Sequence, residues 1–276
     1  MRLFQLYDYS KKILRQHNIS SYEEDSSYLI SSILSIPKSD IFLKKEKKVP
    51  LNKFIKIFLA LRKRCKNIPL AYILGYQHFY ENKFLVNRKT FIPKFDTEHI
   101  IYEAKNICKN FENIIDICTG TGILAITLAK IFPQSKVIGI DKYIKIAKKN
   151  AKLIGINNVK FLKSDLLNFK ENFEHKFDLI VSNPPYLSIE DFKLLSYECK
   201  KYEPKEAFYG GEDGLIFYRK IKDFSLSFLK ENGYIIMEVD HKWQNVLNIF
   251  IEAGFKDFKI IKDYNQLERV LILRKV

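Results

Sequence analysis

Short apolar segments alternate with longer helical patterns from residue 113 onward. The alternation predicts strands at 113–118, 136–140, 159–162, 177–182, 234–239, 258–261 and 269–273, and helices at 123–131, 143–153, 215–230 and 243–253. Because parallel strands need a long and usually helical crossover, we expect a doubly wound, mostly parallel sheet of the α/β class. The last two strands are joined by a short turn near 263–266, which predicts an antiparallel pair at the edge. Residues 93–276 should therefore form a seven-stranded Rossmann-like domain.

The first 75 residues show helical periodicity and no strand pattern. Ser21-Tyr22-Glu23-Glu24 predicts a capping box that opens a helix. A further helix at 51–66 should pack a wide apolar face, made of Phe54, Ile55, Phe58, Leu59 and Leu61. We predict a small helical domain at 1–75, with a structural or partner-binding role. A β-hairpin linker at 76–92 and a helix at 97–110 should lead into the sheet.

Composition excludes several classes of protein. The apolar content of 47% over 276 residues is ordinary for a globular core. No apolar run approaches the roughly 20 residues of a membrane span, and no secretion signal is evident. The four cysteines have no metal-ligand spacing, so a reducing cytoplasm is expected. The net charge of +15 would suit nucleic acid, but scattered lysines amid many Ile, Asn, Phe and Tyr residues also fit AT-rich coding bias.

A glycine loop follows the strand at 113–118. Gly120 and Gly122 lack side-chain bulk where the backbone would approach a ligand, and a helix N-terminus follows them. Asp141 ends the next strand, where a carboxylate can accept hydrogen bonds from ribose hydroxyls. This pattern predicts a nucleoside cofactor, although residues 120–125 also fit a loose nicotinamide dinucleotide fingerprint.

The strand at 177–182 ends in Asn-Pro-Pro-Tyr. Neither Pro184 nor Pro185 can donate to a sheet ladder, so the chain must turn at the carboxyl end of the strand. The side-chain oxygen of Asn183, the Pro184 carbonyl and the Tyr186 ring suit a planar NH2 group. Two prolines alone would predict only a strand end, and the flanking Asn and Tyr favour a binding site.

Asp116 distinguishes a nicotinamide dinucleotide from another nucleoside cofactor. Its carboxylate near the loop suits an ammonium group and would repel a pyrophosphate. Together with the Asn-Pro-Pro-Tyr turn, this favours S-adenosylmethionine. Asp165, which precedes Leu166 after the third strand, should either meet the adenine amine or cap a helix.

Five further segments carry a family resemblance, namely residues 69–75, 91–98, 203–204, 210–215 and 268–270. With the cofactor loop and the Asn-Pro-Pro-Tyr turn, they resemble the glutamine N5-methyltransferases that modify peptide chain release factors. The resemblance covers nearly the whole chain. It implies methyl transfer to the side-chain amide of the Gln in the Gly-Gly-Gln motif of bacterial class I release factors, which the helical domain would recognise. It also implies that the methionine end of the cofactor is lined by Cys118, Thr119, Gly120, Thr121 and Gly122.

The resemblance implies roles for the remaining residues as well. Asp141 would hold the ribose, and Asp165, Leu166 and Asn183 would also contact the cofactor. Asn183 with the Pro184 carbonyl would hold the amide in a pocket shaped by Pro185 and Tyr186. The departures from the family pattern are Cys118 for Gly, Lys94-Phe95 for Arg-Pro, Leu166 where an aromatic can stand, a segment about one helical turn shorter after Asp141, and Asp240 for Gly. We interpret Cys118 as a small filler, not as a nucleophile. None of these departures touches the amide-binding turn.

Attack by the amide nitrogen needs no strong base, because the proton can leave after the methyl group is transferred. His78, His175 and His241 are accordingly expected to be structural or exposed. Two alternatives remain at this point. One is an adenine N6-methyltransferase acting on DNA or RNA, which would bring its base into the same pocket. The other is a catalytically silent module that binds release factors or ribosomes.

Overall fold

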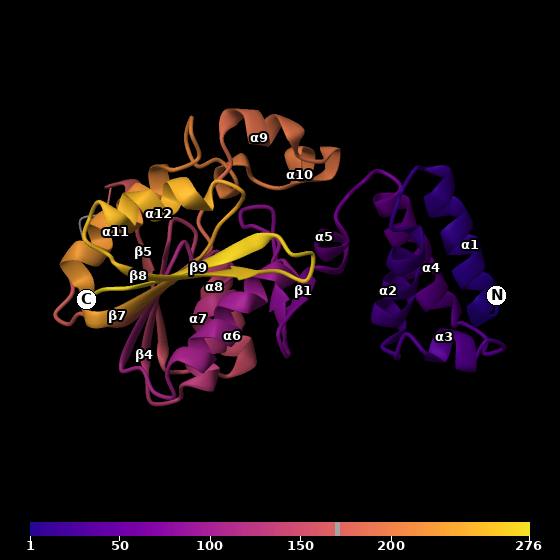
Figure 1. Ribbon diagram of the computed structural model, residues 1–276. Coiled ribbons are helices and arrows are strands. Elements are labelled where there is room, and N and C mark those ends of the chain that lie inside the picture. Colours follow the sequence, from indigo (N-terminus) through magenta and orange to yellow (C-terminus); the bar gives the residue numbers. More distant parts are fainter. Residues whose placement is uncertain (169–171) are drawn as a thin grey trace. The chain divides into compact units, whose positions relative to one another are not determined.

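A computed structural model describes residues 1–168 and 172–276 (Figure 1). The chain forms two compact units. The first contains residues 1–76 and 196–202, and the second contains residues 77–195 and 203–276. Within the described residues, no helix is long and apolar enough to cross a lipid bilayer.

The first unit is helical. Its helices are α1 (Leu3–Gln16), α2 (Tyr22–Leu34), α3 (Asp40–Leu43), α4 (Leu51–Arg64), α5 (Leu70–Leu74) and α10 (Tyr197–Tyr202). Leu6, Leu14, Leu29 and Ile57 are among the buried residues of its core. The predicted capping box at Ser21 is wrong, because the Ser21 hydroxyl makes no capping hydrogen bond and its ψ of 26° is not the extended value that such a cap requires.

Helix α4 buries a narrower face than its sequence predicts. Ile57, Ala60 and Leu61 are buried, whereas Ile55 and Leu59 are 48% and 50% exposed. The apolar residues of α4 cover more than one side of the helix, and the covered side faces α1, α2 and α5. Arg64 continues the buried stripe because its Nε lies 2.6 Å from Asp25 Oδ2, which pairs the buried charge.

The second unit contains the predicted seven-stranded sheet. Its strand order is β5-β4-β3-β6-β7-β9-β8, with the bounds β3 (Asn113–Ile117), β4 (Lys136–Asp141), β5 (Val159–Lys163), β6 (Phe177–Ser182), β7 (Leu229–Glu238), β8 (Asp257–Lys262) and β9 (Glu268–Arg274). Strands β3 to β7 pair in parallel. The predicted antiparallel pair is β8 and β9, and β9 lies between β7 and the edge strand β8.

Helices cover both faces of this sheet (Figure 1). One face packs against α6 (Glu98–Ile107), α7 (Ile123–Ile131) and α8 (Lys145–Ile154). The other packs against α11 (Ile216–Phe228) and α12 (Trp243–Ile251). Strand β3 is buried along its whole length because it lies in the middle of a sheet covered on both sides.

The second unit also contains several shorter elements. They are the two-stranded sheet of β1 (Tyr76–Phe79) and β2 (Asn82–Leu85), helix α9 (Ile189–Leu194), and the 3-10 turns η1 (Phe95–Thr97), η2 (Leu166–Asn168) and η3 (Lys205–Ala207). Strands β1 and β2 pair within the segment predicted as a hairpin, and the rings of Phe79 and Phe84 are fully buried with centroids 6.2 Å apart.

Strand register places the candidate site residues together at the carboxyl ends of the parallel strands. Ile117 lies opposite Ile140 on β4 and opposite Ser182 on β6. The residues that follow these strand ends are therefore neighbours, since paired strands lie about 5 Å apart. Cys118, Asp141 and Asn183 lie close together at these carboxyl ends, which is where open α/β sheets bind their ligands.

Candidate active site

The turn after β6 has two buried residues and two half-buried ones. Pro184 and Pro185 are buried, whereas Asn183 and Tyr186 are partly exposed. The Asn183 amide nitrogen donates to Thr97 Oγ1 at 3.0 Å. Because the two ends of a planar carboxamide point in different directions, the Asn183 oxygen is directed away from Thr97. The turn thus fixes one end of this amide within the protein.

A buried carboxylate lies behind the turn. Glu238, the last residue of β7, is 4% exposed. Its Oε2 accepts from the Thr97 hydroxyl at 2.6 Å, and its Oε1 accepts from the Tyr186 hydroxyl at 3.2 Å. Burial raises the pKa of the Tyr186 phenol well above its ordinary value, so the hydroxyl keeps its proton and donates. Neither Thr97 nor Glu238 was named from the sequence as a site residue.

The glycine segment at 210–214 supports the turn from outside. The Leu187 N–H donates to the Phe208 carbonyl at 2.8 Å, and the Gly210 N–H donates to the Leu187 carbonyl at 2.9 Å. Gly214 has φ +81°, and a Cβ added there would lie 2.3 Å from the Tyr186 carbonyl oxygen. The close approach of two backbones explains why glycine stands here.

Gly214→Ala should therefore destabilise the protein by about 3 kcal/mol or more, because positive φ and a backbone clash add together. The matched control is Gly155→Ala, where φ is +82° but an added Cβ meets nothing within 4 Å. Its expected cost is only the conformational one, about 1 kcal/mol. Urea unfolding measures both, and equal losses would show that an added Cβ at position 214 does not clash with the turn after β6.

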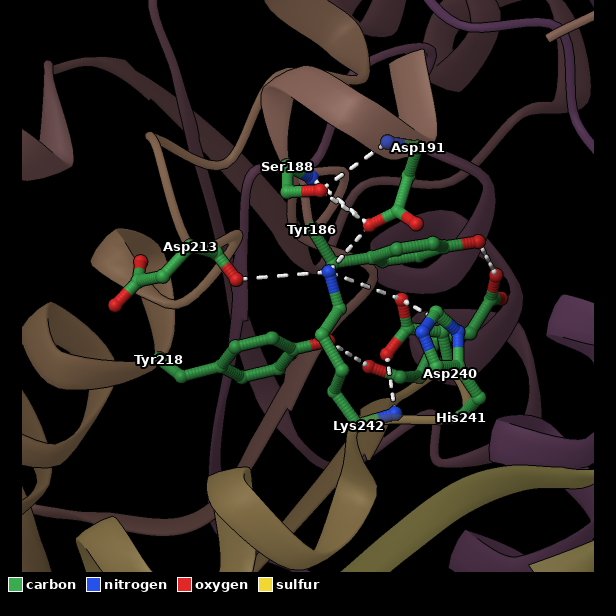
Figure 2. A network of polar contacts seen from close by, with 9 residues as sticks. Tyr186, Ser188, Asp191, Asp213, Tyr218, Asp240, His241 and Lys242 are labelled. Atoms are coloured by element: carbon green, nitrogen blue, oxygen red, sulfur yellow. Dashed lines mark hydrogen bonds and ion pairs between the residues drawn. The ribbon is translucent and has the colours of Figure 1, made fainter. Parts of the chain in front are cut away.

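A lysine ties together the segments around the turn (Figure 2). The Lys242 ammonium nitrogen lies 2.5 Å from Asp191 Oδ2 and 3.7 Å from Asp240 Oδ2, and 3.5 Å from the Asp213 carbonyl. Asp191 also caps α9 together with Ser188. Burial would raise the pKa of Asp191, but hydrogen bonds from Lys242 and Ser188 lower it to about 2. Asp240 thus joins an ion network beside the turn.

Asp116 lies beneath the glycine loop and is 1% exposed. Its Oδ2 accepts from the Thr119 hydroxyl at 2.5 Å and from the Ala125 N–H at 3.0 Å. Its Oδ1 is buried and has no hydrogen-bond partner among the described residues. Burial raises the pKa of Asp116 to about 7, and the nearby Asp141 carboxylate acts in the same direction. A buried carboxylate oxygen that lacks a donor fits the cationic amino group of a cofactor.

Asp141 braces the loop from the next strand. Its Oδ2 accepts from the Gly120 N–H and its Oδ1 from the Tyr143 N–H, both at 2.9 Å. Each carboxylate oxygen can accept a second hydrogen bond, so these contacts leave capacity for ribose hydroxyls. Burial raises the pKa of Asp141, while the two N–H groups lower it.

The two loop glycines serve different purposes. At Gly120 an added Cβ would meet only the Cys118 carbonyl, at 3.9 Å, so this position is open as predicted. At Gly122 it would lie 2.8 Å from Ile126 Cδ1 and 3.1 Å from Ala147 Cβ. Glycine is thus needed at position 122 for internal packing against α7 and α8, and its contact with a cofactor stays a prediction.

The other loop residues shape this segment from within. Thr119 and Thr121 are buried; the Thr119 hydroxyl binds Asp116, and the Thr121 carbonyl accepts from Asn150 at 2.8 Å. Cys118 has φ +63°, a conformation that a Cβ disfavours by about 1–2 kcal/mol. Burial raises the pKa of its thiol well above the ordinary value, which supports a filler and not a nucleophile.

The remaining predicted residues lie as follows. Asp165 Oδ1 accepts from the Leu167 N–H at 3.1 Å, so it caps η2, and its Oδ2 lies 3.2 Å from Lys142 Nζ. Its contact with adenine stays a prediction. Leu166 is buried in the core that contains Ile117 and Ile140, so it offers little surface for stacking. The side chains of His78, His175 and His241 are exposed, as predicted.

The sheet order, the glycine loop and the two loop carboxylates define an S-adenosylmethionine-dependent methyltransferase. Residues 109–254 match the family model described as a methyltransferase domain, and residues 5–75 match the PrmC N-terminal domain. In fold, the chain is similar to the solved structure of a Thermus thermophilus 16S rRNA N2 G1207 methyltransferase in complex with AdoMet and guanosine. That likeness has a TM-score of 0.51 and 16% identity, over 73% of this chain and 50% of the other.

Two curated relatives identify the family. A release factor glutamine methyltransferase of Fusobacterium nucleatum is 34% identical over 98% of this chain and 78% of its own length. One of Clostridium botulinum is 36% identical over 95% of each chain. The chain belongs to the release factor glutamine methyltransferase family.

Proposed function

We propose that this methyltransferase modifies the side-chain amide nitrogen (N5) of the Gln in the Gly-Gly-Gln motif of bacterial class I peptide chain release factors. The observation that carries the proposal is the juxtaposition of an amide-accepting turn with a loop suited to a cationic cofactor. Strand pairing puts Asn183 directly beside the Cys118 loop. The names of the relatives support the choice of a protein glutamine over another planar amine.

Asn183 and the Pro184 carbonyl have complementary roles in this proposal. The Asn183 oxygen and the Pro184 carbonyl oxygen each accept one N–H of the substrate amide, which points the nitrogen lone pair toward the cofactor. S-adenosylmethionine supplies the electrophilic methyl group when it is bound. As the nitrogen becomes positive, the same two oxygens stabilise its N–H groups. The proton leaves afterwards to water, so no side chain must act as a strong base.

Asp116 and Asp141 would hold the cofactor. The unpartnered Asp116 Oδ1 would pair with its amino group, and Asp141 would accept from its ribose hydroxyls. The open position at Gly120 allows the backbone to approach the cofactor closely. Thr119 fixes the Asp116 carboxylate from the opposite side. These residues bind the cofactor and take no part in bond making.

The partner and the location of the protein belong to the same proposal. Residues 1–75, which match the PrmC N-terminal domain, would recognise the release factor, and the reaction would take place in the cytoplasm. Nucleic acid would not be a substrate, and its contact with this basic chain would be indirect.

Incubation with methyl-labelled S-adenosylmethionine and either a release factor or nucleic acid tests the proposal. We expect label in the release factor, and mass spectrometry should place one methyl group on the Gln of the Gly-Gly-Gln peptide. Label in adenine and none in the release factor would favour the nucleic-acid alternative. Failure to bind the cofactor in a calorimetric titration would favour the catalytically silent module.

A further inference from the structure

Four polar side chains form a continuous chain of hydrogen bonds within the second unit. The Asn183 amide nitrogen donates to Thr97 Oγ1, the Thr97 hydroxyl donates to Glu238 Oε2, and Glu238 Oε1 accepts from the Tyr186 hydroxyl. Thr97 lies in η1 and Glu238 ends β7. These two residues are 0% and 4% exposed, so water does not substitute for their partners.

The direction of this chain is set by its carboxylate. Burial raises the pKa of Glu238, while the hydrogen bonds from Thr97 and Tyr186 lower it. In its ionised form Glu238 can only accept hydrogen bonds, so Thr97 gives its single hydroxyl proton to Glu238. Thr97 Oγ1 can then only accept from Asn183. The carboxamide of Asn183 must accordingly present its nitrogen to Thr97 and its oxygen to the opposite side. If the amide were reversed, its oxygen would face an oxygen with no proton left to offer.

Further contacts hold the carboxylate in place. Tyr186 occupies its second oxygen, and the Tyr218 hydroxyl donates to the Glu238 main-chain carbonyl at 2.8 Å. Tyr218 is buried as well, so both the backbone and the side chain of Glu238 are fixed. Packing of this kind around a polar group restricts it to one rotamer, as precise positioning requires.

We propose that Thr97 and Glu238 are positioning residues, which fix the Asn183 carboxamide with its oxygen toward the acceptor nitrogen. The inference rests on the proposed function of Asn183 and deepens it. Neither residue touches the substrate or the cofactor. They act by keeping the acceptor oxygen in place before the substrate arrives, so no orientation has to be selected during the reaction.

Thr97→Val tests the inference, because valine keeps the shape of threonine and removes the hydroxyl that orients the Asn183 carboxamide. We expect kcat/KM for the release factor to fall roughly tenfold to a hundredfold. The dissociation constant for S-adenosylmethionine, measured by calorimetry, should stay within about twofold, since the Thr97 hydroxyl bonds to Asn183 and Glu238 and not to the cofactor loop. Thr97→Ser, which restores a hydroxyl at the same position, should recover most of the lost kcat/KM.

The matched control is Thr127→Val in α7. Thr127 is also 0% exposed, and its hydroxyl has no hydrogen-bond partner among the described residues. This variant should leave kcat/KM unchanged. The inference would be overturned if Thr97→Val had the same kcat/KM as the wild-type protein. It would also be overturned if Thr97→Ser lost as much kcat/KM as Thr97→Val. An equal loss of cofactor affinity and turnover in Thr97→Val would overturn it too, because it would indicate general damage.

Glu238→Gln provides a second test that preserves side-chain shape. Glutamine can donate to Thr97, which would allow Thr97 to donate to Asn183 and would turn the Asn183 oxygen inward. We expect a loss of kcat/KM without loss of cofactor affinity. Unchanged kcat/KM in a folded variant would contradict the positioning role of Glu238. Absence of methyl transfer by the wild-type protein would refute the proposed function instead, so the two failures are distinguishable.

Discussion

Asn183→Ala should abolish methyl transfer, with kcat lowered by roughly a thousandfold or more. The variant removes the oxygen that accepts one substrate N–H and leaves the Pro184 carbonyl as the remaining acceptor, so the nitrogen is neither oriented nor stabilised as its charge grows. The dissociation constant for S-adenosylmethionine should change by no more than about threefold. Single-turnover assays with a release factor and calorimetric titration with the cofactor measure the two quantities separately.

The control for this variant is Asn158→Ala. The Asn158 amide nitrogen donates to the carbonyls of Ala129, Phe132 and Ser135, so this asparagine has a structural role at a distance from the turn. Its removal should lower the free energy of unfolding by about 1–3 kcal/mol and leave kcat at the wild-type value at a temperature where the variant is folded. Near-normal turnover by Asn183→Ala would refute the role assigned to Asn183.

The sheet could be predicted from the sequence because each of its elements carries a local signal. The residues at 123–131 are apolar enough to form a buried helix, and α7 has these bounds. The apolar run at 177–182 is followed by Asn183 and two prolines, and β6 ends at Ser182, just before them. Strand ends and glycine turns then placed Asp141 and Asn183 at one edge, because parallel strands share the direction of their carboxyl ends.

The contacts behind the turn could not be predicted in the same way. Thr97 and Glu238 are 141 positions apart, and their contact depends on how η1 lies against the end of β7. No local pattern distinguishes Glu238 from a surface glutamate. The exposed face of α4 escaped prediction for a related reason, since periodicity shows that a helix is apolar and not which apolar side another helix covers. Gly122 is similar, because its neighbours Ala147 and Phe161 come from later elements.

Asp116→Asn should abolish measurable cofactor binding and yet stabilise the cofactor-free protein at pH 8. The pKa of Asp116 is about 7 in the folded protein and 3.8 by itself. The folded state therefore holds a proton that the unfolded state releases between these values. Stability associated with Asp116 is fully present below about pH 4 and is lost as the pH rises through about 7, at up to about 1.4 kcal/mol per pH unit. Asparagine carries no charge, so the variant avoids a cost of about 2–4 kcal/mol at pH 8.

Urea unfolding of the wild type and of Asp116→Asn between pH 4 and pH 8 measures this difference. The two proteins should have similar stability near pH 4, where ionisation of Asp116 in the unfolded state only begins, and the variant should gain on the wild type as the pH rises to about 7. If the free energies of unfolding of the two proteins changed with pH in the same way, ionised Asp116 would not destabilise the folded protein. Calorimetric titration should detect the loss of cofactor affinity in the same samples.

Cofactor affinity of the wild type should rise from pH 5.5 to pH 7.5, up to about tenfold per pH unit at the acidic end. The cationic amino group pairs with ionised Asp116, so binding below pH 7 must first expel the proton that burial keeps on the carboxyl. Asp141, whose pKa is also raised by burial, contributes in the same direction. Calorimetry in buffers of different ionisation enthalpy counts the released protons. Flat affinity over this range, with no proton release, would mean that Asp116 is already ionised before the cofactor binds.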